Sequence, residues 1–278
     1  MTKYITRNII KKMKITSENA EYQVIKSLKT NRVKRNKLQE IFIEGTECIK
    51  QAIKANMEIT RMIIQDKSNL SGWGKDVIES NKNAELISMS DKLYSGLSDK
   101  NNPSEMLITC KMKQYKTSDI KTENPFFIVF DRPSDFGNFG SIIRSANMFN
   151  IDAIFIMGHG VDIYEPKVIR SSLGSVFFTK IILLESMEKL ADFIKSQKEI
   201  NSMEVIGTDS EGAVSLNNIK IKRPVMLILG NEAKGMSVKL KEICDKTVSI
   251  PINGNVNSLN VSCAASILMW EIFKGSHE

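Results

Sequence analysis

The chain reads Phe126-Phe-Ile-Val-Phe130, and a loop, Asp131-Arg-Pro-Ser-Asp-Phe-Gly-Asn138, follows at once. Five consecutive apolar residues predict a strand that is buried on both faces, as in the centre of a parallel sheet. The residues of the loop favour turns, and the apolar spacing from 142 to 149 predicts a helix. Ser141 is the expected cap of that helix, which would place Arg144 on its first turn.

Similar apolar runs recur further along the chain, with helical patterns between them. The runs lie at residues 154–157, 176–184, 205–207 and 225–229, and the longest helical pattern covers 187–200. This alternation predicts an α/β fold, a parallel sheet with helices on both sides. In such sheets ligands bind beyond the carboxyl ends of the strands, where the strand order reverses.

The N-terminal half has shorter elements of the same kind. Strands are expected at 41–43, 59–64 and 85–89, a helix capped by Thr46 after the first strand, and a second helix around 76–80. This pattern predicts a smaller α/β domain. A polar stretch before Pro125 is the expected linker, which gives an N-terminal domain at 1–117, a linker at 118–124 and a C-terminal domain at 125–278.

Composition and charge narrow the classes of function. The 278 residues carry a net charge of +7, and basic residues crowd together between 26 and 37. Such a cluster is either a solvated helix face or a patch that contacts phosphates. The four cysteines are isolated in sequence and there are two histidines, so no zinc or redox motif is predicted. No apolar run is long enough to span a membrane and no signal peptide is recognised, so we expect a cytoplasmic protein with reduced thiols.

Two further loops follow apolar runs in the second half. The first, Gly230-Asn-Glu-Ala-Lys-Gly235, has the glycine spacing of a phosphate loop, but Met236 stands where that loop needs lysine, so nucleotide triphosphate binding is rejected. Its backbone amides could still hold a small carboxylate or an adenine. The second, from Ser249 to Ser262, is rich in Asn and Gly and leads into an apolar helix. Alone it is equally consistent with a well-capped terminal helix.

Arg144 is the most informative charged residue of these segments. An arginine on the first turn of a helix is unfavourable against the helix dipole, and this indicates a functional role. The alternative interpretation is an exposed surface arginine.

Taken in order, the three segments resemble the SpoU (TrmH) family of RNA ribose methyltransferases, in the SPOUT superfamily. The resemblance rests on Asn138…Gly140…Arg144, on Gly230-Asn231-Glu232…Gly235, and on Ile250-Pro251…Ser258-Leu259-Asn260-Val261-Ser262, and it covers 125–274. The N-terminal half resembles the ribosomal-protein-like RNA-binding domain often joined to that family. The stretch from Gly158 through Lys167 to Arg170 is similar to the thiostrepton-resistance branch, which modifies large-subunit ribosomal RNA.

The resemblance implies an α/β knot, a homodimer and methylation of a ribose 2′-hydroxyl with S-adenosylmethionine, without a metal. The implied substrate is RNA, 23S ribosomal RNA above all. Roles also follow from the resemblance, with residues in three groups: a catalytic group of Arg144, Asn138, Glu232, Ser258 and Asn260; a cofactor-binding group of Thr208, Gly230, Asn231, Ile250 and Leu259; and an RNA-binding group of Lys34, Arg35, Lys167 and Arg170.

Two alternatives stay open at this point. One is methylation of transfer RNA, because the N-terminal sequence names no target. The other is a non-catalytic RNA-binding or ribosome-assembly protein, against which the presence of Arg144, Glu232 and Asn260 argues.

Overall fold

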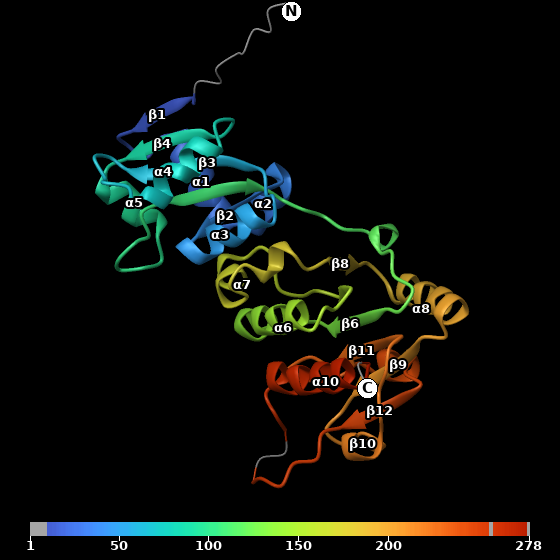
Figure 1. Cartoon of the computed structure of the whole chain (residues 1–278). Coiled ribbons are helices and arrows are strands. Elements are labelled where there is room, and N and C mark those ends of the chain that lie inside the picture. Colours follow the sequence, from blue (N-terminus) through green and yellow to red (C-terminus); the bar gives the residue numbers. More distant parts are fainter. Residues whose placement is uncertain (1–9, 256–257, 277–278) are drawn as a thin grey trace, which may run out of the picture. The chain divides into compact units, whose positions relative to one another are not determined.

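A computed structural model describes residues 10–255 and 258–276, which form two compact units (Figure 1). The first unit comprises the chain up to Lys113 together with Tyr164–Arg170. The second comprises Gln114–Ile163 and the chain from Ser171 onward.

The second unit contains a seven-stranded sheet in which every pair of neighbours is parallel. The strand order is β10-β12-β9-β11-β6-β7-β8, so β6 lies between β7 and β11 and the order reverses at β6. All six residues of β6 are buried, as the apolar run predicts. The strands are β6 (Phe126–Asp131), β7 (Ala153–Met157), β8 (Ile181–Leu184), β9 (Glu204–Thr208), β10 (Val214–Ser215), β11 (Val225–Leu229) and β12 (Lys246–Ser249).

Helices pack on both faces of this sheet. On one face, α8 (Met187–Asn201) and α9 (Val238–Glu242) share a core with Phe127 and Phe155. On the other face, the ring of Phe139 in α6 (Phe136–Met148) lies 6.1 Å from that of Phe130. The last helix, α10 (Val261–Gly275), packs beside α6. Short 3₁₀ turns complete the unit at η1 (Thr117–Asp119), η2 (Ser175–Phe177) and η3 (Leu216–Asn218).

Two expectations for the second unit are wrong. The apolar run at 176–184 is a strand only from Ile181, because Ser175–Phe177 forms η2, where the Thr179 hydroxyl donates to the Ser175 carbonyl. Ser141 is not a helix cap. Helix α6 begins at Phe136, and its cap is Asp135, whose carboxylate accepts from the Asn138 backbone N–H at 2.7 Å. Arg144 therefore lies beyond the first turn, and the argument from the helix dipole does not apply to it.

The first unit is built on a mixed five-stranded sheet of order β1-β4-β3-β5-β2. Its strands are β1 (Lys12–Ile15), β2 (Glu40–Glu44), β3 (Ile59–Gln65), β4 (Glu85–Met89) and β5 (Leu107–Lys111). Its helices are α1 (Ala20–Thr30), α2 (Arg32–Leu38), α3 (Thr46–Lys54), α4 (Gly72–Ser80) and α5 (Asp91–Leu97). Helix α3 is capped by Gly45 at φ +102° rather than by Thr46, which is its first residue.

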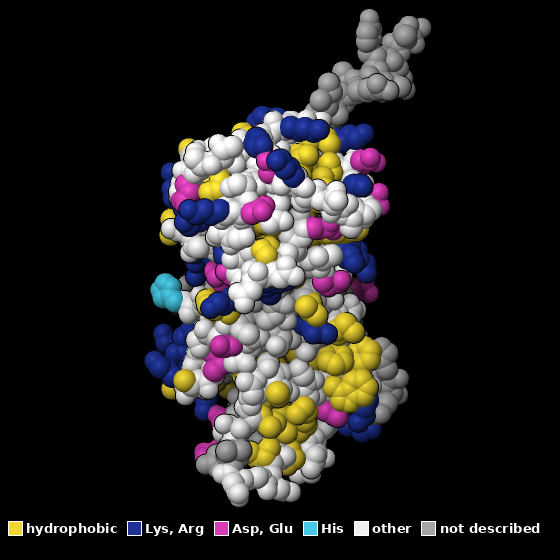
Figure 2. Space-filling model, turned by 90° about the vertical axis from the view of Figure 1, so that its left-hand side faces the viewer, with side chains coloured by type: hydrophobic (Ala, Val, Ile, Leu, Met, Phe, Trp, Pro, Cys, Tyr) yellow, Lys and Arg dark blue, Asp and Glu magenta, His cyan; other side chains and the backbone are white. Residues whose placement is uncertain are grey.

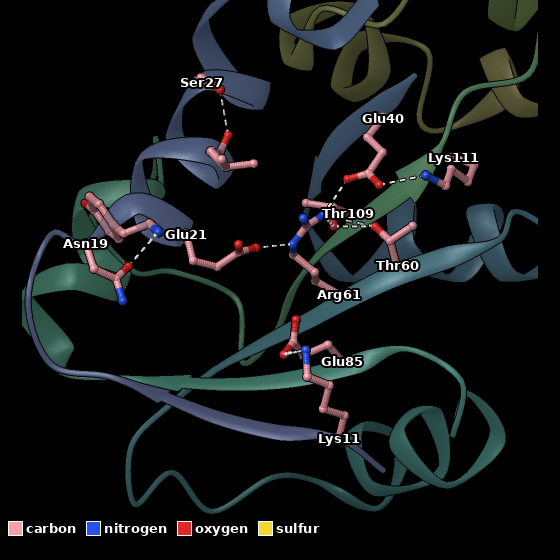
Figure 3. A network of polar contacts seen from close by, with 12 residues as sticks. Lys11, Asn19, Glu21, Ser27, Glu40, Thr60, Arg61, Glu85, Thr109 and Lys111 are labelled. Atoms are coloured by element: carbon pink, nitrogen blue, oxygen red, sulfur yellow. Dashed lines mark hydrogen bonds and ion pairs between the residues drawn. The ribbon is translucent and has the colours of Figure 1, made fainter. Parts of the chain in front are cut away.

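Arg61 in β3 joins three elements of the first unit (Figure 3). Its guanidinium donates to Glu21 of α1 and to Glu40 of β2, and Lys111 of β5 also donates to Glu40 at 2.9 Å. Burial alone would raise the pKa of Glu40, but the hydrogen bonds from Lys111 and Arg61 outweigh it and lower that pKa. This network of hydrogen bonds links helix α1 to the sheet.

The segment Tyr164–Arg170, which includes most of α7 (Pro166–Ser171), packs with the first unit although it follows β7 of the second. The Glu165 carboxylate accepts from Arg35 at 2.7 Å, and the Tyr164 hydroxyl donates to the Lys113 carbonyl at 2.7 Å. The chain therefore passes from one unit to the other three times.

Gly140 of α6 allows a close packing contact in the second unit. A Cβ at this position would lie 1.9 Å from Ser171 Oγ and 2.9 Å from the Ser172 backbone nitrogen. We expect Gly140→Ala to lower the free energy of unfolding by about 1–3 kcal/mol, because it overfills a packed contact. Urea unfolding measures this. Gly72→Ala is the control, since nothing lies within 4 Å of its added Cβ. Equal stability of both variants would contradict the tight contact.

Candidate active site

A pocket opens at the carboxyl ends of β9, β11 and β12, close to the reversal in strand order. Its volume is about 430 Å³. Its walls come from three stretches: the residues after β9, the loop after β11 with Lys241 of α9, and the segment from the end of β12 into α10. The lining side chains on which the argument depends are Thr208, Asp209, Met236, Lys241, Ile250, Leu259 and Leu268. Ligand sites of parallel α/β sheets lie at this edge.

The loop after β11 folds back tightly on itself. Asn231 and Gly235 exchange two backbone hydrogen bonds, of 3.0 and 2.9 Å, and Gly235 has φ +65°. The Asn231 side-chain oxygen accepts from the backbone N–H groups of Ala233 and Lys234. A Cβ on Gly230 would lie 2.5 Å from the Met236 nitrogen, so only glycine fits there. The loop thus presents backbone, rather than side chains, at one wall of the pocket.

An ion pair that the sequence did not reveal lies in the pocket wall. Lys241 of α9 contacts Asp209, which directly follows β9, at 2.5 Å. The hydrogen bond from Lys241 is the main cause that lowers the pKa of Asp209. The position of Asp209 just beyond a predicted strand was the available signal, but its partner is far away in sequence.

Glu232 ties the loop after β11 to the start of α6. Its carboxylate accepts from the Ser134 hydroxyl at 2.7 Å, from the Ser134 backbone N–H at 3.1 Å and from the Asp135 backbone N–H at 3.2 Å. These three hydrogen bonds fix the backbone at the start of α6 relative to the loop after β11.

Asn260 ties the start of α10 to the same helix. Its side-chain nitrogen donates to Asn138 Oδ1 at 2.9 Å, while its oxygen caps α10 by accepting from the Ser262 N–H at 2.9 Å. About two helix turns further along, the hydroxyls of Ser145 and Ser266 hydrogen-bond at 2.8 Å. Contacts with the start of α6 therefore hold the loop after β11 and the start of α10 in place.

The cofactor-binding and catalytic residues expected from the sequence take three kinds of position. All five residues predicted to bind a cofactor line the pocket, and so do Glu232 and Ser258; the five are Thr208, Gly230, Asn231, Ile250 and Leu259. Asn138 and Asn260 meet beside it. Arg144 is exposed on α6 and makes no hydrogen bond or ion pair with any residue in 10–255 or 258–276.

The residues expected to contact RNA do not behave alike. Lys34 and Lys167 are exposed. The expectation for Arg35 is wrong, because its side chain is 1% exposed and its guanidinium binds the carbonyls of Leu28 and Lys29 and the carboxylate of Glu165. Four of the seven residues of α2 are basic, so charge alone could not separate the buried arginine from its exposed neighbours.

Arg170 also has an internal role. Its guanidinium lies 2.9 Å from the Asp99 carboxylate and 3.7 Å from that of the buried Glu44. Two carboxylates compensate this cation, so the expectation that it contacts RNA is corrected to an ion pair within the first unit.

Within the described parts of the chain, no helix is long and apolar enough to cross a bilayer. Among the same residues, no cluster of three or more potential metal ligands occurs.

The Asn138–Asn260 hydrogen bond predicts energetic coupling between α6 and α10. Asn138→Ala should lower the free energy of unfolding by about 1 kcal/mol, and Asn260→Ala by about 1–2 kcal/mol because it also removes a helix cap. In the double variant the losses should fall short of their sum by about 0.5–1 kcal/mol. Urea unfolding of the four proteins tests this, and strict additivity would show that the bond contributes nothing.

Both halves of this chain match known protein families. A model of the SpoU rRNA Methylase family matches residues 125–270, and a model of the SpoU L30e-like domain matches residues 19–109. A 23S rRNA (uridine(2479)-2′-O)-methyltransferase from Streptomyces viridochromogenes is 31% identical over 93% of this chain and 91% of its own length. The 23S rRNA (guanosine(2553)-2′-O)-methyltransferase RlmP from Bacillus subtilis is 24% identical over 92% of this chain and 98% of its own.

A solved structure gives the same result. The SpoU methyltransferase AviRb from Streptomyces viridochromogenes, in complex with AdoMet, superposes with a TM-score of 0.85 at 30% identity, covering 92% of this chain and 97% of that one. The two domain matches, the identity over nearly the full length and the shared fold lead to one conclusion: this chain belongs to the SpoU rRNA methylase family.

Proposed function

We propose that this protein methylates a ribose 2′-hydroxyl of large-subunit (23S) ribosomal RNA with S-adenosylmethionine as the methyl donor. The observation that carries the proposal is the pocket at the ends of β9, β11 and β12, lined by all five residues expected to bind that cofactor. The names of the relatives from Streptomyces viridochromogenes and Bacillus subtilis support the choice of RNA. A cytoplasmic location, where ribosomal RNA is found, is part of the proposal.

The pocket suits an adenosine-containing sulfonium. Ile250, Leu259 and Leu268 supply apolar wall for an adenine, and the glycine at 230 lets backbone groups approach it. Thr208 donates its hydroxyl hydrogen to the Ile228 carbonyl at 3.0 Å, which leaves the oxygen lone pairs as acceptors. When bound, the cofactor would supply a methyl group already activated by positively charged sulfur, so the protein's part is to bind and orient.

Arg144 is the residue we assign to the target ribose. Hydrogen bonds to Glu232, Asn260 and Ser266 fix the helix that carries Arg144. The Arg144 side chain itself is exposed. A guanidinium stays protonated in water, so its role is to hold a phosphate or to stabilise the emerging alkoxide, rather than to accept the proton. Ser258, at the edge of the pocket, and the Asn138–Asn260 pair would help to orient the ribose.

The first unit would deliver the RNA. Arg32, Lys34 and Lys37 are exposed on α2, and Lys167 is exposed on α7. Cations spread in this way suit phosphates, while specificity must come from a shaped and partly unpaired target.

An exposed apolar patch supports a homodimer. Met148 at the end of α6 and Ile267 and Trp270 of α10 are 72%, 38% and 49% exposed, and the rings of Phe149, Trp270 and Phe273 contact one another. Figure 2 shows hydrophobic side chains gathered on one face of the second unit. A contiguous patch of this kind marks an interface more often than a solvated surface.

The α/β knot that is expected of the family, with the chain end threaded near the cofactor, completes the proposal.

The proposal predicts cofactor binding without metal. Isothermal titration calorimetry in excess chelator should show saturable binding of S-adenosylmethionine, with one site per chain. Adenosine triphosphate is the control ligand and should not bind, because Met236 replaces the lysine of a phosphate loop. Absence of S-adenosylmethionine binding would refute the enzymatic function.

Arg144→Ala should reduce methylation of ribosomal RNA at saturating cofactor by about 100-fold or more, as the loss of one transition-state contact does. The Kd for S-adenosylmethionine should stay within about twofold, since Arg144 does not line the pocket. Asn147→Ala changes an exposed neighbour on the same helix and should be active. An active Arg144→Ala enzyme would assign the ribose to another residue.

Trp270→Glu should convert the dimer to a monomer in sedimentation velocity, because a charge in an apolar interface loses its hydration. The control is Ile200→Glu on α8, where the side chain is 71% exposed. A Trp270→Glu protein that sediments as the wild type would place the dimer interface elsewhere or remove it.

A further inference from the structure

We propose that Asp131, which no sequence motif assigned, is a positioning residue for the cofactor pocket. Its carboxylate fixes the loop between β11 and α9 by accepting a hydrogen bond from Ser237, and loss of that acceptor weakens cofactor binding while the chemical step is spared. The inference rests on the proposed function in one respect, that the pocket binds S-adenosylmethionine.

Asp131 is the last residue of β6 and is 3% exposed. One carboxylate oxygen accepts from Arg132 Nε at 2.8 Å. The other accepts from a second guanidinium nitrogen of Arg132 at 2.8 Å and from the Ser237 backbone N–H at 2.8 Å. The guanidinium compensates the buried charge, and the contact with Ser237 joins two segments 106 residues apart.

The bond to Ser237 closes the loop that forms a wall of the pocket. Leu229, just before the loop, pairs with Phe130 in the sheet, and Ser237, just after the loop, binds Asp131. Both ends of the segment 230–236 are therefore held by two consecutive residues of β6, and this segment lines the pocket. Ser237 is also the residue that precedes α9, which carries Lys241.

Arg132 strengthens the same closure. It has φ +48°, a left-handed conformation that costs a non-glycine residue energy and persists where the surroundings fix it. In that conformation its side chain returns to Asp131, and its carbonyl accepts from Asn231 Nδ2 at 2.7 Å. The Asp131–Arg132 pair thus holds the start of the loop through Asn231 and its end through Ser237.

Removal of the carboxylate would release the end of the loop. Asp131→Ala leaves the Ser237 N–H without its acceptor and the Arg132 guanidinium without its counterion. Asp131→Asn keeps an oxygen at the same place, which can still accept from Ser237. Because Asp131 is not among the residues that line the pocket, it acts on a ligand only through the loop.

The chain offers a closely matched control at the other end of the same strand. The Asp152 carboxylate accepts from the Phe126 backbone N–H at 2.8 Å and from Arg223 at 3.3 Å, so it too binds a backbone amide and an arginine. It lies at the amino end of β6, away from the pocket. Asp152→Ala also removes the acceptor of a backbone amide and of an arginine, without touching the loop.

The test is calorimetric binding of S-adenosylmethionine to the full-length protein, together with thermal unfolding. We expect Asp131→Ala to raise the Kd about tenfold, and both Asp131→Asn and Asp152→Ala to stay within about twofold of wild type. Both alanine variants should unfold at lower temperature. Turnover of Asp131→Ala at saturating cofactor should stay within about twofold, so that the effect falls on KM. If Asp131→Ala does not fold, Asp131→Ser, whose hydroxyl is too short to reach Ser237, takes its place with the same expectation.

Equal Kd values for Asp131→Ala and Asp152→Ala would overturn the proposal and leave Asp131 a purely stabilising residue. An Asp131→Asn protein that binds as weakly as Asp131→Ala would overturn the role of the Ser237 hydrogen bond. Both outcomes differ from failure of the proposed function, in which the wild-type protein itself binds no S-adenosylmethionine.

Discussion

The parallel pairing of β6 with β11 is the constraint on which the functional half of this protein depends. It places Phe130 beside Leu229, so the loops that follow the two strands leave the sheet side by side. Hydrogen bonds then join these loops, from Ser134 and Asp135 to Glu232 and from Ser237 to Asp131. Each bond needs the strands in this register, since a shift of one residue would turn every side chain to the opposite face.

Helix α6 carries that constraint from the sheet to the site. Its start is held by Glu232 and by Asn260, and Gly140 lets it pack closely against Ser171. Most of the polar residues around the start of α6 therefore bind one another, while Arg144 remains exposed. A fixed helix with one exposed arginine suits a reaction in which the cofactor supplies the activated methyl group and the protein aligns the reactants.

Sequence alone predicted much of this arrangement and missed the rest for physical reasons. The apolar runs of β6, β7, β9 and β11 mark buried parallel strands, and the segments after β9 and β11 hold residues that line the pocket. Local pattern could not place the start of α6, because the cap Asp135 precedes two glycines that favour a loop. It could not reveal the burial of Arg35 or the ion pair of Arg170 with Asp99, since these depend on a segment, Tyr164–Arg170, that packs with the other unit.

The central claim is that this protein methylates ribose 2′-hydroxyls in ribosomal RNA, and mapping of those methyl groups tests it most directly. Mass spectrometry of nuclease fragments would compare 23S ribosomal RNA from cells with the protein, without it, and with the Arg144→Ala variant. The account predicts a 2′-O-methylated nucleotide that is present only with the intact protein, while transfer RNA is unchanged. Identical methylation in all three ribosomal RNA samples would contradict it, and a change confined to transfer RNA would move the substrate to that class.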